Sequence, residues 1–143
     1  MPEMPFPDDL RALLHKPNPA VVATLRKDGA PVSVATWYLL EDDDRILLSM
    51  DSTRVRLQHL RRDPRLSLTV LDEASWYVHV SVVGRAVELR DDEGLEDINR
   101  ISRHYRGQDY PDQESPRVTA VLEVDRWHGW NSGKGVSGER VGD

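Results

Sequence analysis

The stretch Ser49-Met50-Asp51-Ser52-Thr53-Arg54-Val55-Arg56 joins an apolar strand to a helix that the pattern predicts over residues 53–62. Hydroxyl side chains at the turn come just before two arginines. A helix N-terminus adds free N–H groups and a partial positive charge. Charge-assisted hydrogen bonds from guanidinium groups, together with hydroxyls, suit a phosphate group. The stretch therefore indicates an anion pocket, with two solvent-facing arginines on an ordinary helix as the alternative.

The chain has 143 residues and no cysteine. This length is typical of one domain, and we expect a single domain over residues 1–143 with an ordered core at about 8–130. Residues 1–7 and 131–143 are expected to be arms or tails. The lack of cysteine excludes disulfides, thiolate metal sites and a cysteine nucleophile. No membrane-span or signal-peptide pattern is visible, which favours a cytoplasmic protein without a membrane partner.

The formal net charge is −6, yet residues 54–65 contain five arginines. An acidic protein is a poor match to nucleic acid. The planar guanidinium group suits phosphates and carboxylates, although a GC-rich genome would also enrich arginine. We therefore expect a small anionic ligand and no nucleic-acid partner.

Apolar runs bounded by turn residues predict six strands. Asp28-Gly29 is a strong hairpin signal, and Gly84 marks an expected bulge. Residues 107–116 are expected to form a polar loop or a second short helix. The expected strands are residues 20–25, 30–40, 45–50, 65–71, 76–89 and 118–127, and the expected helices are residues 10–15, 53–62 and 91–105. The short turns between strands favour an antiparallel barrel with inserted helices over a parallel sheet.

Motifs that would identify a catalytic mechanism are absent from the sequence. It contains no glycine-rich nucleotide motif, P-loop, nucleophile elbow or His-Glu-x-x-His. None of the five histidines has metal-ligand spacing with another, although His128, between two tryptophans, is a candidate neighbour of a site. The acidic turn at residues 41–44 lacks the glycine and distal glutamate of a calcium loop. We interpret it as a solvated hairpin loop and expect no metal.

A second informative stretch is residues 31–38, Pro-Val-Ser-Val-Ala-Thr-Trp-Tyr. Its small and hydroxylated side chains leave space for a flat ligand near the backbone, although ordinary strand alternation gives the same pattern. Trp37, Trp76, Trp127 and Trp130 form an aromatic set in a chain with one phenylalanine. Core packing accounts for one or two of them, and the others are candidates for walling a site for a planar substrate.

The order of these motifs resembles the flavin-binding split-barrel superfamily of pyridoxamine 5′-phosphate oxidase-like proteins. The resemblance covers about residues 8–130. It implies a mainly β fold, a six-stranded antiparallel split β-barrel with short flanking helices. The segments that carry it are residues 21–25 with the Asp28-Gly29 hairpin, residues 31–38, the pair Arg54-x-Arg56, residues 60–65 and residues 83–86.

Within the superfamily the chain most resembles the short branch that binds coenzyme F420, a deazaflavin, rather than FMN. In that branch an Arg-x-Lys or Arg-x-Arg pair after the third strand binds the cofactor phosphate. The resemblance assigns this role to Arg54 and Arg56. The pyrimidine edge of the ring is held by backbone of the second strand, which corresponds to Ala35, Thr36 and Trp37.

The same resemblance implies that Ser49 and Met50 flank the ring, with the Ser52 hydroxyl at the phosphate turn. Members of the branch are dimers whose cofactor site lies between subunits. Trp76 and Trp130 would then lie near the site of the partner subunit.

The implied reaction is hydride transfer from the reduced cofactor to an electron-poor conjugated small molecule, with the protein positioning the reactants and excluding water. No catalytic acid or base is assigned. The sequence around residues 133–135 has no counterpart of the substrate-phosphate segment of the vitamin-B6 oxidases, so pyridoxamine phosphate oxidation is not expected. The alternatives are an FMN-dependent oxidoreductase on the same fold and a non-catalytic flavin- or tetrapyrrole-binding protein.

Overall fold

The computed structural model describes residues 6–131 and 134–139. The helices in this part of the chain are α1 (Asp8–Leu14), α2 (Val55–Arg62), the short 3-10 helix η1 (Glu93–Leu95) and α3 (Glu96–Arg106). The strands are β1 (Ala20–Leu25), β2 (Pro31–Thr36), β3 (Leu39–Leu40), β4 (Ile46–Asp51), β5 (Arg65–Leu71), β6 (His79–Asp91), β7 (Arg117–Asn131) and β8 (Lys134–Glu139).

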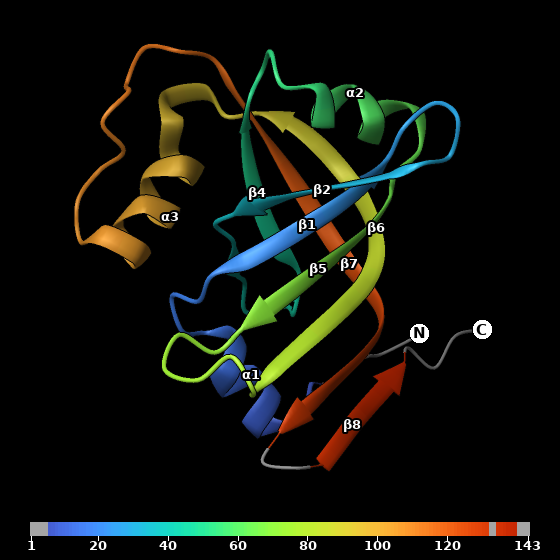
Figure 1. The fold of residues 1–143 in the computed structure, drawn as a ribbon. Coiled ribbons are helices and arrows are strands. Elements are labelled where there is room, and N and C mark those ends of the chain that lie inside the picture. Colours follow the sequence, from blue (N-terminus) through green and yellow to red (C-terminus); the bar gives the residue numbers. More distant parts are fainter. Residues whose placement is uncertain (1–5, 132–133, 140–143) are drawn as a thin grey trace.

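These strands form one strongly curled antiparallel sheet (Figure 1). Seven strands follow the order β2-β1-β5-β6-β7-β4-β3, and β8 pairs with β7. The predicted mainly β, antiparallel split barrel is confirmed. The predicted number of six strands is too low, because the expected strand at residues 30–40 is divided in two and β8 was not expected.

The division lies at Trp37-Tyr38, between β2 and β3. These two strands are consecutive in the sequence but lie at opposite ends of the strand order. Tyr38 is 1% exposed, and its hydroxyl donates a hydrogen bond of 2.8 Å to the backbone oxygen of Leu14. Trp37 stacks on Tyr105 of α3, with ring centroids 5.1 Å apart. Packing of these two rings therefore interrupts the strand, and β2 is left as an edge of the sheet.

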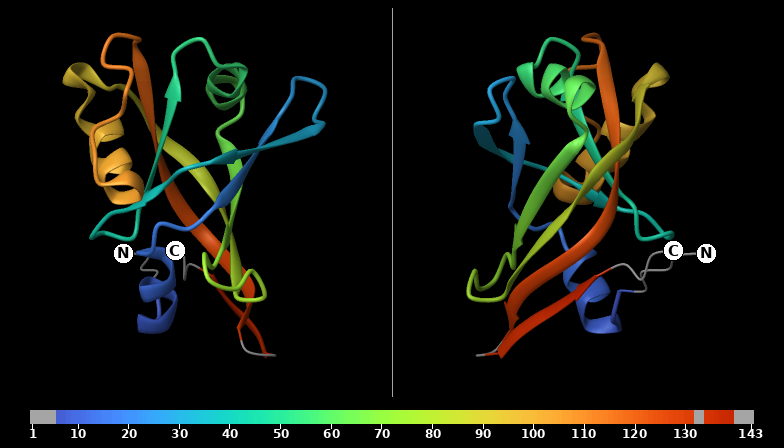
Figure 2. Two further views of the ribbon diagram at one scale, coloured as in Figure 1. Left: turned by 60° about the vertical axis from the view of Figure 1, so that its left-hand side comes forward. Right: turned by 90° about the vertical axis from the view of Figure 1, so that its right-hand side faces the viewer.

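Alternation along the strands directs one set of apolar side chains into the barrel. On β5, for example, Leu66, Leu68 and Val70 are buried in strict alternation. The helices α1 and α2 lie at opposite ends of the barrel (Figure 2). Phe6 packs edge-to-face against Trp127 at 5.4 Å, so residue 6 belongs to the core rather than to the expected arm.

The helix α3 forms a second layer on the side of β4 and β7 that faces away from the barrel core (Figure 1). Leu47, Ile101 and Val121 form a separate buried cluster beneath it. On β4, Ile46 and Met50 face the barrel core while Leu47 belongs to this second cluster. The alternation of β4 therefore places Ser49 on the side of α3.

The start of α3 differs from the predicted helix over residues 91–105. The backbone at Gly94 and Leu95 is left-handed, so the regular helix begins only at Glu96. Asp92 caps it, because its carboxylate accepts hydrogen bonds from the backbone N–H groups of Asp97 (3.0 Å) and Ile98 (2.9 Å).

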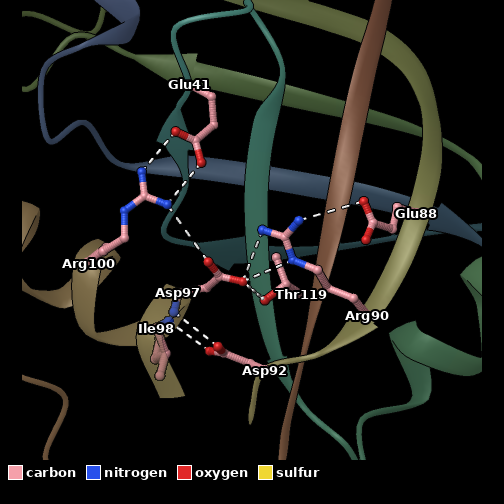
Figure 3. A network of polar contacts seen from close by, with 8 residues as sticks. All are labelled: Glu41, Glu88, Arg90, Asp92, Asp97, Ile98, Arg100 and Thr119. Carbon is pink, nitrogen blue, oxygen red and sulfur yellow. Dashed lines mark hydrogen bonds and ion pairs between the residues drawn. The ribbon is translucent and has the colours of Figure 1, made fainter. Parts of the chain in front are cut away.

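A network of ion pairs then fixes α3 to the sheet (Figure 3). The Asp97 carboxylate accepts hydrogen bonds from Thr119 Oγ1 (2.7 Å) and Arg90 Nε (3.2 Å). Arg100 makes two parallel hydrogen bonds to Glu41, at 3.0 and 2.8 Å. The acidic turn at residues 41–44 thus contributes a partner for α3 and is not only a solvated loop.

The expected bulge at Gly84 is confirmed, because the register between β6 and β7 shifts between Val83 and Gly84. A Cβ atom at Gly84 would collide with the backbone carbonyl of Glu123, so only glycine fits here without displacement of a strand. Residues 107–116 form a loop, the first of the two predicted alternatives.

Part of the expected C-terminal tail is the strand β8, which continues the sheet beside the far end of β7 (Figure 1). Residues 1–5, 132–133 and 140–143 lie outside the described residues. Among the described helices, none is both long and apolar enough to cross a membrane. The described residues also contain no group of three or more metal-ligating side chains arranged to hold a metal ion.

Candidate functional site

A cavity of about 550 Å³ lies where the end of β2, the start of α2, the outer side of β4 and α3 meet. Cavities of this volume are typical of small-molecule and cofactor sites. Five of the eight predicted site residues line it, namely Ala35, Thr36, Trp37, Ser49 and Arg56. Two stretches that are separate in the sequence are therefore brought to one site by the curl of the sheet.

The other three predicted residues lie elsewhere. Met50 is 3% exposed and belongs to the core of the barrel, because it points to the opposite side of β4 from Ser49. Ser52 and Arg54 are exposed beside the cavity and do not line it. Arg54 precedes the first turn of α2 with an extended backbone, since the helix begins at Val55 rather than at the predicted residue 53.

Positive charge accumulates at one end of the cavity. Arg56 has a buried Nε atom that finds no hydrogen-bond partner among the described residues. Burial lowers the pKa of the Arg56 guanidinium, and the neighbouring charges of Arg54 and Arg117 lower the pKa further. A buried polar group without a partner is costly, so this atom is poised for a ligand that accepts a hydrogen bond.

Arg117 is a cavity residue that sequence reasoning missed. It opens β7 and pairs in register with Asp51 at the end of β4. Its Nε donates a hydrogen bond of 2.9 Å to Ser49 Oγ. Its guanidinium carbon lies 4.8 Å from the centroid of the Tyr110 ring, a cation–π contact. Only the pairing of β4 with β7 places this arginine beside Arg56.

Asp51 is one of two acidic residues that act on this cluster, and Asp112, which acts on Arg117, is the other. Its carboxylate accepts hydrogen bonds from the Thr53 backbone N–H (2.9 Å) and hydroxyl (2.7 Å). These bonds lower the pKa of Asp51, with smaller contributions from Arg117 and Arg54. Asp51 therefore stays charged at neutral pH and compensates part of the arginine charge.

The other end of the cavity is apolar and aromatic. Ile98, Ile101 and Tyr105 lie along one face of α3. Their helical spacing in the sequence indicates an apolar helix face that packs against another part of the protein. The Tyr105 hydroxyl donates a hydrogen bond of 2.7 Å to the backbone oxygen of Asn18. Burial raises the pKa of Tyr105 to about 12, so this ring is neutral and fixed against Trp37.

The backbone of β2 supplies polar groups to the same cavity. Among the described strands β2 pairs only with β1, so its outer edge carries N–H and C=O groups outside the ladder. Thr36 Oγ1 donates to the neighbouring backbone oxygen of Trp37 at 2.9 Å and is already engaged. The free backbone edge beside Trp37 and Tyr105 is suited to a planar ring that hydrogen-bonds along one side.

Trp76, which is expected near the site of a partner subunit, and His128, a candidate site neighbour, do not line this cavity. Trp76 and Tyr77 stack on each other in the turn before β6, with ring centroids 4.5 Å apart, and both are more than half exposed. His128 is exposed on β7. The side chain of Trp130 lies outside the described part of the structure.

Several solved structures share this fold. One described as an F420 reductase has a TM-score of 0.77 and 22% sequence identity, and the match covers 85% of this chain and 98% of that one. A putative pyridoxamine 5′-phosphate oxidase from Listeria innocua matches with a TM-score of 0.66 and 19% identity over 87% of this chain and 98% of that one. A heme-binding protein from Mycobacterium smegmatis matches with a TM-score of 0.66 and 20% identity over 95% of this chain and 60% of that one.

These likenesses establish the fold, and a family comparison goes further. The family described as pyridoxamine 5′-phosphate oxidase matches residues 6–131, which include every strand that lines the cavity. The chain therefore belongs to the pyridoxamine 5′-phosphate oxidase family of split-barrel proteins.

Proposed function

We propose that the protein is an F420-dependent oxidoreductase that reduces an electron-poor, conjugated small molecule. The observation that carries this proposal is the buried Arg56 Nε atom, which has no hydrogen-bond partner among the described residues. It lies at the positively charged end of a cavity whose other end is apolar and contains the stacked rings of Trp37 and Tyr105. A ligand with a phosphate at one end and a flat ring at the other matches both features. The likeness of fold to a protein described as an F420 reductase supports the choice of deazaflavin.

The residues present fit such a cofactor. Arg56 and Arg54 would hold the phosphate, with Ser52 at the adjoining turn. The free edge of the backbone at Ala35, Thr36 and Trp37 would hydrogen-bond the polar edge of the ring, and Ser49 would flank it. Met50 would support this wall from the barrel core without touching the ligand.

When bound and reduced, F420 supplies a hydride equivalent to the substrate. The protein's own contribution is to position the two reactants and to exclude water, through the fixed Trp37–Tyr105 wall and the apolar side chains of α3. The Tyr105 hydroxyl is committed to the backbone oxygen of Asn18, and we assign no side chain of the cavity as a proton donor. The product would then take its proton from solvent.

We also propose a homodimer with the cavity next to the interface. The outer face of the β2-β1-β5-β6 part of the sheet has a central patch of small, hydroxylated or apolar side chains, and Val21 in it is 36% exposed. The side chains of this patch are Val21, Ala23, Ser33, Ala35, Ser67, Thr69, Ser81 and Val83. Arg65, Arg85 and His79 lie on the same face at the two ends of the pairing between β5 and β6. An uncharged patch with a charged rim is typical of a surface that a second copy covers.

Analytical ultracentrifugation tests the dimer. The wild-type protein is expected to sediment as a dimer, and Val21→Arg is expected to shift it towards monomer because it buries an unpaired charge. A wild-type monomer at micromolar concentration would contradict the proposed interface.

The cofactor is tested by spectroscopy and titration. The purified protein is expected to lack the yellow absorbance of FMN and to bind F420 in a fluorescence titration. Reduced F420 is then expected to be oxidised in the presence of at least one member of a panel of quinones and enones. Bound FMN would replace the deazaflavin proposal by an FMN enzyme, and F420 binding without any turnover across the panel would favour a binding protein.

A further inference from the structure

We infer that Arg117 is a third anion-binding side chain of the cavity and that it contacts the phosphate end of the ligand. This inference deepens the proposed function, on which it rests, by naming a further residue that holds the phosphate. It assigns a binding role to a residue on β7, far in sequence from Arg54 and Arg56 at the start of α2.

The guanidinium group of Arg117 is fixed in position but has no ion-pair partner among the described residues. Its Nε is occupied by Ser49 Oγ at 2.9 Å, which fixes the plane of the guanidinium group. Among the described residues no carboxylate lies within ion-pair distance of it. Its two terminal nitrogens are therefore available to a ligand in the cavity that Arg117 lines.

Charge in this part of the site is not balanced. The guanidinium groups of Arg54, Arg56 and Arg117 are close enough to act on one another or on Asp51, and Arg117 also acts on the carboxylate of Asp112. Three arginines therefore face two carboxylates, and neither carboxylate lines the cavity. An excess of positive charge remains, which an anionic ligand in the cavity would neutralise.

The loop after α3 holds Arg117 from its other side. The Tyr110 ring packs on the guanidinium group and also meets the edge of Trp37, with ring centroids 6.2 Å apart. The Tyr110 backbone N–H donates to Asn99 Oδ1 at 3.0 Å, and Gln113 Nε2 donates to the same oxygen at 2.8 Å. Tyr110 thus connects the anion end of the cavity to its aromatic wall.

Two ligand chemistries provide such an anion. One is the phosphomonoester of FMN, and the other is the phosphodiester of F420. Riboflavin has the same ring system as FMN and no phosphate, so its affinity measures only the contacts that the cavity makes with the ring.

The test compares Arg117→Ala and Arg117→Lys with Arg126→Ala, an exposed arginine on the same strand that serves as the control. Affinities for F420, FMN and riboflavin are measured by fluorescence titration at several salt concentrations. We expect Arg117→Ala to weaken the binding of the phosphorylated ligand about ten-fold and to reduce its salt dependence. Arg117→Lys is expected to retain part of the affinity, and Arg126→Ala and riboflavin binding are expected to be unchanged.

The outcomes separate this inference from the proposed function. If the wild type binds F420 and Arg117→Ala binds it equally well, the inference fails and the proposed function stands. An equal loss of riboflavin and FMN affinity would also overturn it, because Arg117 would then act on the ring wall. If the wild type binds neither F420 nor FMN, the proposed function fails. In that case the melting temperature is measured with and without inorganic pyrophosphate. An increase in the wild type that is lost in Arg117→Ala would still support the anion site, and an equal increase in both proteins would overturn the inference.

Discussion

Two groups of arginines lie near α3 and differ in one respect. Arg90 and Arg100 are paired with Asp97 and Glu41 in a closed network (Figure 3). Arg56 and Arg117, at the cavity, have no ion pair within the described part of the chain. In a chain with a net charge of −6, carboxylates are not scarce. None of the side chains that line the cavity is a carboxylate, which supports the proposal that a ligand supplies the partner.

The two groups also differ in what they contribute to stability. The paired group fixes α3, which carries Ile101 and Tyr105 in the wall of the cavity. The unpaired group is expected to destabilise the empty protein, because burial of Arg56 is not compensated by a partner. Ligand binding would supply that partner and raise the stability of the fold. The following substitutions test this difference.

Arg56→Ala is expected to have the largest effect of these substitutions. The effect is on cofactor affinity and not on the stability of the fold. Loss of one charge-assisted contact costs about 1.5–3 kcal/mol, or about ten- to a hundred-fold in cofactor affinity. The free energy of unfolding of the empty protein should stay the same or rise slightly, since an unsatisfied buried group is removed. Fluorescence titration and urea unfolding measure the two quantities. Arg61→Ala, an exposed arginine on the same helix, is the control. Equal affinity in wild type and Arg56→Ala would place the phosphate elsewhere.

Asp97→Asn should show the converse pattern, a loss of stability. It removes the charge that Arg90 and Thr119 contact at a site that is 8% exposed. We expect the free energy of unfolding in urea to fall by about 1–3 kcal/mol. Asp109→Asn, whose ion pair with Arg103 is exposed on both sides, is the matched control with little expected change. An Asp97→Asn protein as stable as wild type would show that the network does not fix α3.

Arg54→Ala should weaken the cofactor less than Arg56→Ala does. Arg54 is exposed at the start of α2, so its contact with a phosphate would be screened by water. We expect about a three-fold loss of affinity in the same titration, corresponding to less than about 1 kcal/mol. A loss larger than that of Arg56→Ala would mean that the phosphate lies outside the cavity.

Glu41→Gln should have the smallest effect. It weakens the bidentate pair with Arg100, which is partly exposed, and the expected loss of stability is about 0.5 kcal/mol in urea unfolding. Cofactor affinity should not change. A drop in affinity without a drop in stability would show that the two arginine groups are coupled through α3.

The sequence predicted most of the barrel because strand alternation and turn residues are local signals. The strands at residues 20–25 and 65–71 begin and end where they were predicted. The prediction of strand boundaries was wrong where tertiary contacts determine them. At Trp37-Tyr38, packing against Tyr105 and Leu14 divides a segment whose residues favour one continuous strand. The strand β8 was missed because its glycines and polar residues carry no apolar alternation, and pairing with β7 determines it.

The residues that line the cavity divide in the same way. Arg56 and residues 35–37 belong to local motifs of the sequence and line the cavity, and their role in binding stays a prediction. Met50 was placed in the site with Ser49, although adjacent residues of a strand point to opposite sides. Arg117 could not be found from its neighbours in sequence, because the pairing of β4 with β7 alone places it beside Ser49.

A structure of the protein bound to F420 tests the central claim most directly. The account predicts that a phosphate oxygen of the cofactor accepts a hydrogen bond from Arg56 Nε, the buried donor that has no partner among the described residues. It also predicts that the polar edge of the ring contacts the backbone of residues 35–37. Cofactor bound at another surface, or bound in the cavity with Arg56 Nε still unpartnered, would contradict it.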